Sequence, residues 1–162
     1  MEYLKLFKLL DTSGVRYLLC GGLAVNIYGI PRMTADIDII LDFEEVNLLK
    51  FEDITKLISY TAVLPFSIKQ MVNKEVRSSF IKEKNLIAYS YFNNLKNVMS
   101  LDVLVDVPIP FNELWDKREV RTSFDFKINI VSINDLIQLK KYSNRKQDND
   151  DILLLSQLNN GK

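Results

Sequence analysis

The spacing of apolar and polar residues predicts helices that alternate with strands along the chain. Apolar residues three or four positions apart are typical of an amphipathic helix, and short apolar runs are typical of a strand. Helical spacing and capping residues predict helices over 2–12, 23–28, 44–59, 111–117, 133–142 and 148–158. Apolar and aromatic runs predict strands over 15–20, 37–41, 76–82, 86–92, 97–107 and 124–131. This alternation predicts one α/β (α+β) domain over residues 1–162, with a mixed β-sheet flanked by helices.

The composition narrows the chemistry that such a domain can perform. Lys+Arg and Asp+Glu both number 21, so the chain as a whole is not a polycation that coats nucleic acid. The sequence has no histidine, which excludes histidine bases and histidine-ligated zinc. Its single cysteine, Cys20, excludes an internal disulfide and indicates a reducing compartment. An enzyme of this composition depends on carboxylates, Lys, Arg and a hard metal ion.

The sequence also gives expectations about location. No apolar run reaches the length of a membrane span, so we expect no membrane partner. The first ten residues mix charged and apolar positions, which is typical of an amphipathic helix rather than a signal peptide. We therefore expect a cytoplasmic protein.

Four of the five glycines fall between positions 14 and 29, and two of them are adjacent. Gly21 and Gly22 stand where a predicted strand turns into a helix. Glycine there lets the backbone approach a ligand closely, and the N–H groups that open the helix can bind an anion. A tight turn without a ligand explains the same dipeptide equally well.

Two aspartates, Asp36 and Asp38, alternate with isoleucines in the next predicted strand. Side chains two apart on a strand point to the same face, so these carboxylates lie about 7 Å apart at their Cα atoms. Their repulsion is tolerated at an exposed face, or when a divalent cation lies between them. Taken alone, the pattern also fits an ordinary half-exposed strand.

Together, these motifs resemble the signature of the polymerase-β-like nucleotidyltransferase superfamily. Cys20–Gly22 is followed, after thirteen residues, by Asp36–Ile39, in the order and spacing of that signature. The segment Arg32–Asp38 resembles small AbiEii-type toxin nucleotidyltransferases, as do Ser132–Lys141 and Asn144–Asp151 near the end of the chain. The resemblance implies a minimal nucleotidyltransferase fold of the polymerase-β palm type.

The resemblance also implies a third carboxylate from a later strand. Asp102 and Asp106 both lie in the apolar segment 99–107, and alternation puts them on one strand face. We favour Asp102, because Asp106 is close to Pro108, where the strand is expected to end. Asp36, Asp38 and Asp102 would then be catalytic metal ligands for Mg²⁺ or Mn²⁺.

The implied activity is transfer of a nucleotidyl group from an NTP to a hydroxyl acceptor. Lys140 would be catalytic by neutralising charge on the triphosphate. Because Gln147 interrupts the family pattern Arg-Pro-Lys-Asp and proline is absent, Asp148 is carried over and Arg145 is not. The implied nucleotide-binding residues are Gly21, Gly22, Arg32, Thr34 and Asp148.

The resemblance to toxin enzymes implies tRNA or another RNA as the acceptor, and an antitoxin protein as a partner. Residues 69–84 carry a net charge of +3, which suits a polyanionic acceptor. A small-molecule or protein acceptor stays open. So does a catalytically silent protein that binds a nucleotide or a partner on the same fold.

Overall fold

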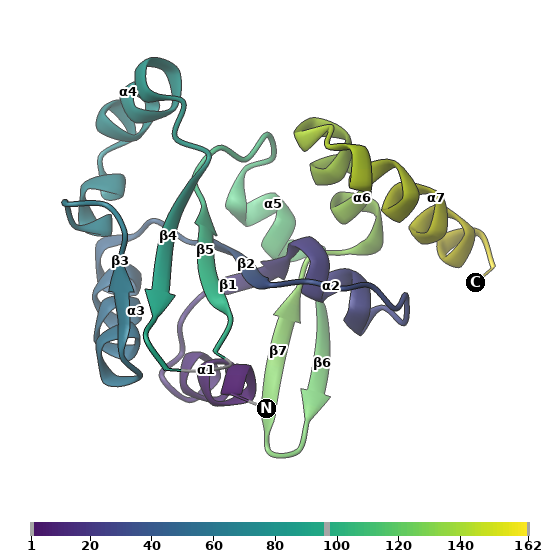
Figure 1. Cartoon of the computed structure of the whole chain (residues 1–162), viewed down its shortest axis with the longest axis horizontal. Coiled ribbons are helices and arrows are strands. Elements are labelled where there is room, and N and C mark those ends of the chain that lie inside the picture. Colours follow the sequence, from purple (N-terminus) through teal and green to yellow (C-terminus); the bar gives the residue numbers. More distant parts are fainter. Residues whose placement is uncertain (1, 96–97, 162) are drawn as a thin grey trace.

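The computed structural model describes residues 2–95 and 98–161, in which seven strands form a single sheet (Figure 1). The helices and strands follow the chain in this order: α1 (Glu2–Thr12), β1 (Tyr17–Cys20), α2 (Gly21–Ile27), β2 (Asp36–Leu41), α3 (Glu45–Leu57), β3 (Tyr60–Ala62), the 3₁₀ helix η1 (Ile68–Val72), α4 (Lys74–Lys84), β4 (Ala88–Asn93), β5 (Ser100–Leu104), α5 (Phe111–Asp116), β6 (Glu119–Ser123), β7 (Phe126–Ile130), α6 (Ile133–Ser143) and α7 (Lys146–Asn160).

The sheet is mixed, with the strand order β3-β4-β5-β2-β1-β7-β6. β2 runs parallel to β5, and β1 runs parallel to β7, whereas the other neighbours are antiparallel. The predicted fold class, a mixed sheet with flanking helices, is therefore confirmed. Residue 97, the first of the predicted strand 97–107, lies outside the described residues, as do residues 1 and 162 of the predicted domain.

One face of β2 and β5 packs into the hydrophobic core. Ile37 and Ile39 on β2 are fully buried, and Leu101 on β5 pairs with Ile37. On the same face, Tyr91 of β4 meets the ring of Phe51 from α3 edge-on, at 5.7 Å between centroids. Because strand side chains alternate, the half-buried aspartates between these isoleucines point to the opposite face. The core thus fixes the direction in which the site opens.

The prediction of a strand over 76–82 is wrong, because this segment belongs to helix α4. The side chain of Asn73 accepts a hydrogen bond from the Val76 N–H (3.0 Å) and caps the helix start. Asn85 ends the helix in the left-handed conformation, with φ of 52°. Val76 and Phe80 are four residues apart, which is helical spacing, and Phe80 stacks on Phe66 at 4.6 Å between ring centroids.

Other differences concern short or polar elements. β3, η1 and β6 were not predicted; β3 has three residues, and β6 is a mostly polar strand at an edge of the sheet. The predicted strand 124–131 shortens to β7, because Phe124 takes a left-handed turn conformation with φ of 53°. Among the described residues, no helix is both long and apolar enough to cross a membrane.

Candidate active site

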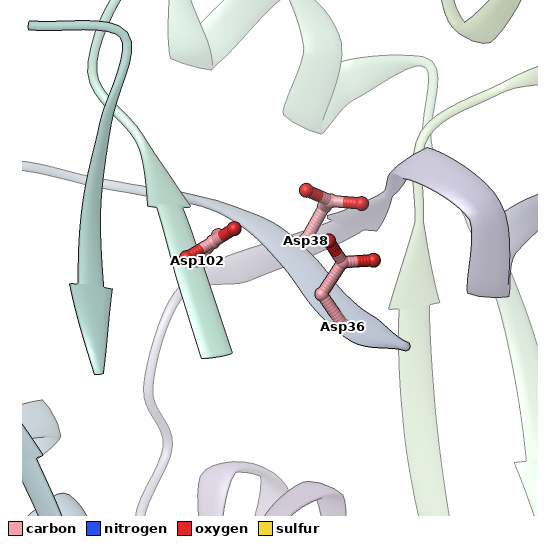
Figure 2. A group of neighbouring side chains, drawn as sticks. All are labelled: Asp36, Asp38 and Asp102. Atoms are coloured by element: carbon pink, nitrogen blue, oxygen red, sulfur yellow. The ribbon is translucent and has the colours of Figure 1, made fainter. Parts of the chain in front are cut away.

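Three aspartates from two neighbouring strands meet on the face of the sheet opposite Ile37 and Ile39. Asp36 and Asp38 lie on β2, and Asp102 on β5 is the register partner of Asp38 (Figure 2). Each offers a carboxylate oxygen, and these three oxygens all lie within 4.8 Å of one another. The parallel pairing of β2 with β5 therefore builds a cluster of three half-buried carboxylates that could hold a cation.

Bringing three carboxylates together disfavours their charged forms, and the pKa of Asp38 shows this effect. The pKa of Asp38 is raised from 3.8 to about 6, mainly by burial and then by the charges of Asp36 and Asp102. The positive charge of Arg145 and a hydrogen bond from the Gly22 backbone N–H act in the opposite direction. A bound divalent cation would relieve this repulsion, and carboxylate oxygens are the ligands that Mg²⁺ and Mn²⁺ prefer.

Asp106, the alternative third acid, lies outside this cluster. β5 ends at Leu104, so the strand alternation that would align Asp106 with Asp102 does not continue. Both carboxylate oxygens of Asp106 instead accept hydrogen bonds from the Tyr142 hydroxyl, each at 3.0 Å. The structure thus brings Asp102, and not Asp106, together with the β2 aspartates.

The glycine pair lets the turn from β1 to α2 approach the acids closely. Gly21 has φ of +63°, and a Cβ there would lie 1.8 Å from Oδ2 of Asp38. A Cβ on Gly22 would lie 2.6 Å from Oγ1 of Thr34. Thr34 in turn donates a hydrogen bond of 3.1 Å to Oδ1 of Asp36. Both glycines and Thr34 therefore shape and orient the carboxylates, whatever else they bind.

A cleft of about 340 Å³ opens beside Asp36 and Asp38. One wall comes from the β1–α2 turn and the segment that leads into β2, and the other from α6 and the start of α7. The predicted site residues that line it are Gly21, Gly22, Arg32, Thr34, Asp36, Asp38, Lys140 and Asp148. Side chains from distant parts of the sequence thus converge on one cavity.

Lys140, on α6, reaches this cleft from a nearly buried position. Its Nζ lies 3.3 Å from Oδ1 of Asp148 and 2.7 Å from Oδ2 of Asp151. Burial raises the pKa of Asp148, but hydrogen bonds from Ser143 and the Arg145 N–H, with the charge of Lys140, outweigh it and lower the pKa overall. The predicted catalytic lysine is therefore held by two carboxylates.

Sequence reasoning left out three residues that the structure places here. Arg145 and Ser143 line the cleft, and Asp151 pairs with both Lys140 and Arg32. Arg145 and Asp151 belong to the motif over 144–151, which was the available signal. The pairing of Asp151 with Arg32 could not be inferred, because Arg32 lies far from α7 in the sequence.

No known protein family and no curated protein matches this sequence. The fold, however, is similar to the crystal structure of the lincosamide antibiotic adenylyltransferase LnuA with lincomycin bound. The similarity has a TM-score of 0.64 at 16% sequence identity, and it covers 97% of this chain and 96% of that chain. The chain thus has the fold of a nucleotidyltransferase. Its closer likeness to AbiEii-type toxin enzymes stays a prediction.

Proposed function

We propose that the protein is a metal-dependent nucleotidyltransferase that moves a nucleotidyl group from an NTP to a hydroxyl of a small organic acceptor. The observation that carries this proposal is the cluster of Asp36, Asp38 and Asp102, whose oxygens lie within 4.8 Å of one another. The cluster adjoins a cleft with a glycine turn on one wall and cations on the other. The similarity of the fold to an adenylyltransferase supports the same activity.

Asp36, Asp38 and Asp102 would hold Mg²⁺ or Mn²⁺. These residues fit such an ion, because they supply only oxygen donors and because burial and the neighbouring carboxylates raise the pKa of Asp38, which a cation would offset. When bound, the metal supplies neutralisation of phosphate charge and activation of the acceptor hydroxyl.

The residues of the chain account for the remaining chemistry. The oxygen of the acceptor hydroxyl bonds to the α-phosphorus. As this bond forms, a carboxylate oxygen of Asp102 accepts the proton of that hydroxyl. The bond from the α-phosphorus to the bridging oxygen breaks, and pyrophosphate leaves with its electron pair. Lys140 and Arg32, which line the cleft, stabilise the negative charge that develops on the leaving group.

The surface beside Asp102 favours a small neutral acceptor. The side chains of β4 and β5 that share its face are Ala88, Ser90, Phe92, Ser100 and Leu104. Ser90 is the direct register partner of Asp102, and none of these five described residues is basic. A polyanion would gain little on this surface. The lincomycin bound to LnuA, a chain matched over 96% of its length, supports a small acceptor.

A second candidate, RNA as the acceptor within a toxin–antitoxin system, is favoured by one observation. The basic residues of 69–84 lie mostly on η1 and α4, and several of them are exposed. Such exposed basic residues could contact the phosphates of an RNA.

The test is a transfer assay with each common NTP labelled at the α-phosphate, with Mg²⁺ or Mn²⁺. The acceptors are a panel of hydroxylated antibiotics that includes lincomycin, and separately total RNA and total protein. We expect label in the small-molecule fraction with the wild type, and none with Asp38→Asn or in EDTA. Label in RNA or protein would overturn the acceptor class. NTP binding without any transfer would instead support the catalytically silent alternative.

A further inference from the structure

Asp151 lies on α7, outside the acid cluster, yet it contacts two cations that line the cleft. We propose that Asp151 is a positioning residue that holds Lys140 of one cleft wall and Arg32 of the other together, so that both meet the triphosphate of an NTP. This role toward the triphosphate rests on the function proposed above.

A single carboxylate oxygen joins two separate segments of the chain. Oδ2 of Asp151 lies 2.7 Å from Nζ of Lys140 on α6, and it also accepts a hydrogen bond from Nη1 of Arg32. Asp151 is 5% exposed, so little water competes for these contacts. Arg32 donates a further hydrogen bond of 3.3 Å to Oε1 of Gln147, also on α7. α7 thereby fixes the segment that leads into β2.

The neighbouring carboxylate, Asp148, has a different role. Its Oδ2 accepts hydrogen bonds from the Ser143 hydroxyl and, at 3.0 Å, from the Arg145 backbone N–H. These bonds fix the turn between α6 and α7, and only Oδ1 faces Lys140. Within the described part of the chain, the hydrogen bonds and ion pairs of the Asp151 carboxylate are all with cations.

The arrangement leaves the two cations usable by a ligand. Lys140 and Arg32 repel each other, and Asp151 between them offsets that repulsion. A lysine ammonium has three N–H donors, and among the described residues two are used by Asp148 and Asp151. The third can donate to a phosphate oxygen in the cleft that Lys140 lines. Loss of the Asp151 charge should therefore let both side chains leave this position.

The first experiment measures the position of Lys140 without any catalysis. Folded protein is acetylated briefly with acetic anhydride, and modification of Lys140 is quantified by mass spectrometry relative to the exposed Lys141. In Asp151→Asn we expect Lys140 to react at least about tenfold faster than in the wild type, because its main ion pair is lost. Asp150→Asn, which neutralises an exposed acid of the same helix, should leave the ratio unchanged. Unchanged Lys140 reactivity in folded Asp151→Asn overturns the proposal.

The second experiment tests whether the position in which Asp151 holds Lys140 contributes to nucleotidyl transfer. With the labelled NTP that the wild type uses, Asp151→Asn should lower kcat about tenfold or more and change KM less. In a Lys140→Met background the same substitution should cost less than about threefold, because the two residues act together. Asp151→Glu should restore part of the activity. Additive losses with no rescue overturn the positioning role, whereas a wild type that transfers from no NTP overturns the proposed function whatever Lys140 reactivity shows.

Discussion

Asp38 is an acid of the cluster that is disfavoured in its charged form, first by burial and then by its two carboxylate neighbours. Removing its charge should stabilise the metal-free protein, because burial and two neighbouring carboxylates raise its pKa to about 6. For Asp38→Asn we expect the free energy of unfolding in EDTA at about pH 8 to rise by about 2 kcal/mol. We expect transfer to fall by about a thousandfold or more, because a proposed metal ligand is lost. Urea denaturation and the labelled-NTP assay measure the two effects.

The matched control for Asp38→Asn is Asp53→Asn, which neutralises an exposed carboxylate on α3. It should change neither quantity beyond about 0.5 kcal/mol or its equivalent in rate. A destabilised Asp38→Asn protein with normal transfer would contradict both the electrostatic argument and the metal-site assignment.

Asp102 and Asp106 provide a second comparison between single residues. Asp102→Asn should lower the transfer rate by several orders of magnitude, because it removes a carboxylate proposed both as a metal ligand and as the proton acceptor. Asp106→Asn should change the rate less than about tenfold, or about 1.4 kcal/mol in barrier, because this carboxylate contacts Tyr142 instead. Steady-state rates of the two variants decide the matter. The reverse ranking would move the proposed site toward the end of β5.

At the scale of elements, α4 packs shallowly on the domain, with Phe80 as a partly buried contact. None of its residues is fully buried, and Asn73 caps its start. Asn73→Ala should cost about 1 kcal/mol of local helix stability. We expect hydrogen exchange at the amides of α4 to quicken about fivefold, with a smaller change in β2 and β5, because the helix can open without the sheet.

Mass-spectrometric hydrogen exchange of peptides from 74–84 and from the central strands makes this measurement. Asn149→Ala, at an exposed position inside α7, is the control for loss of an asparagine side chain. Equal acceleration in α4 and in β2 would show that the helix opens only with the whole domain.

Elements that bury an apolar face could be predicted from the sequence. Elements that form mainly through hydrogen bonds to neighbouring strands could not. β2 and α1 follow their apolar periods closely. β6 has no apolar face to recognise, since its hydrogen bonds to β7 define it. The segment over 76–82 is ambiguous, because the four-residue separation of Val76 and Phe80 fits both a strand face and a helix face, and the Asn73 cap decides for the helix.

In the candidate site too, local features could be predicted from the sequence, and features that depend on strand register or helix packing could not. The shared face of Asp36 and Asp38 follows from a period of two, which is local. The alignment of Asp102 with Asp38 depends on the register of β2 and β5, and the resemblance rather than the spacing supplied it. The contact of Arg32 with Asp151 depends on how α7 packs, which no local pattern encodes.

For the whole molecule, the raised pKa of Asp38 makes stability depend on pH in a definite direction. Between about pH 4 and pH 6 the folded state holds a proton on Asp38 that the unfolded state has released. The Asp38 contribution to the free energy of unfolding in EDTA therefore falls as pH rises through this range. Relative to Asp38→Asn, the wild type should lose about 2 kcal/mol over this interval.

Divalent cations should remove this difference. Mg²⁺ or Mn²⁺ should raise the melting temperature of the wild type more at about pH 8 than at about pH 5, where Asp38 is largely protonated. Thermal melts of the wild type and Asp38→Asn, across pH and with or without metal, test both statements. Parallel curves for the two proteins in EDTA would contradict them.

The parallel pairing of β2 with β5 also determines when, during folding, the three aspartates come together. Parallel strands cannot be joined by a tight turn, and here α3, β3, η1, α4 and β4 lie between them in the chain. Contacts of such long sequence separation form late in folding, because loop closure must precede them. During folding, helix α1 should therefore form before the cluster of Asp36, Asp38 and Asp102 that could hold a cation. Manganese capture during refolding would time the closure of the central sheet, and a captured ion would slow unfolding far more than it speeds folding.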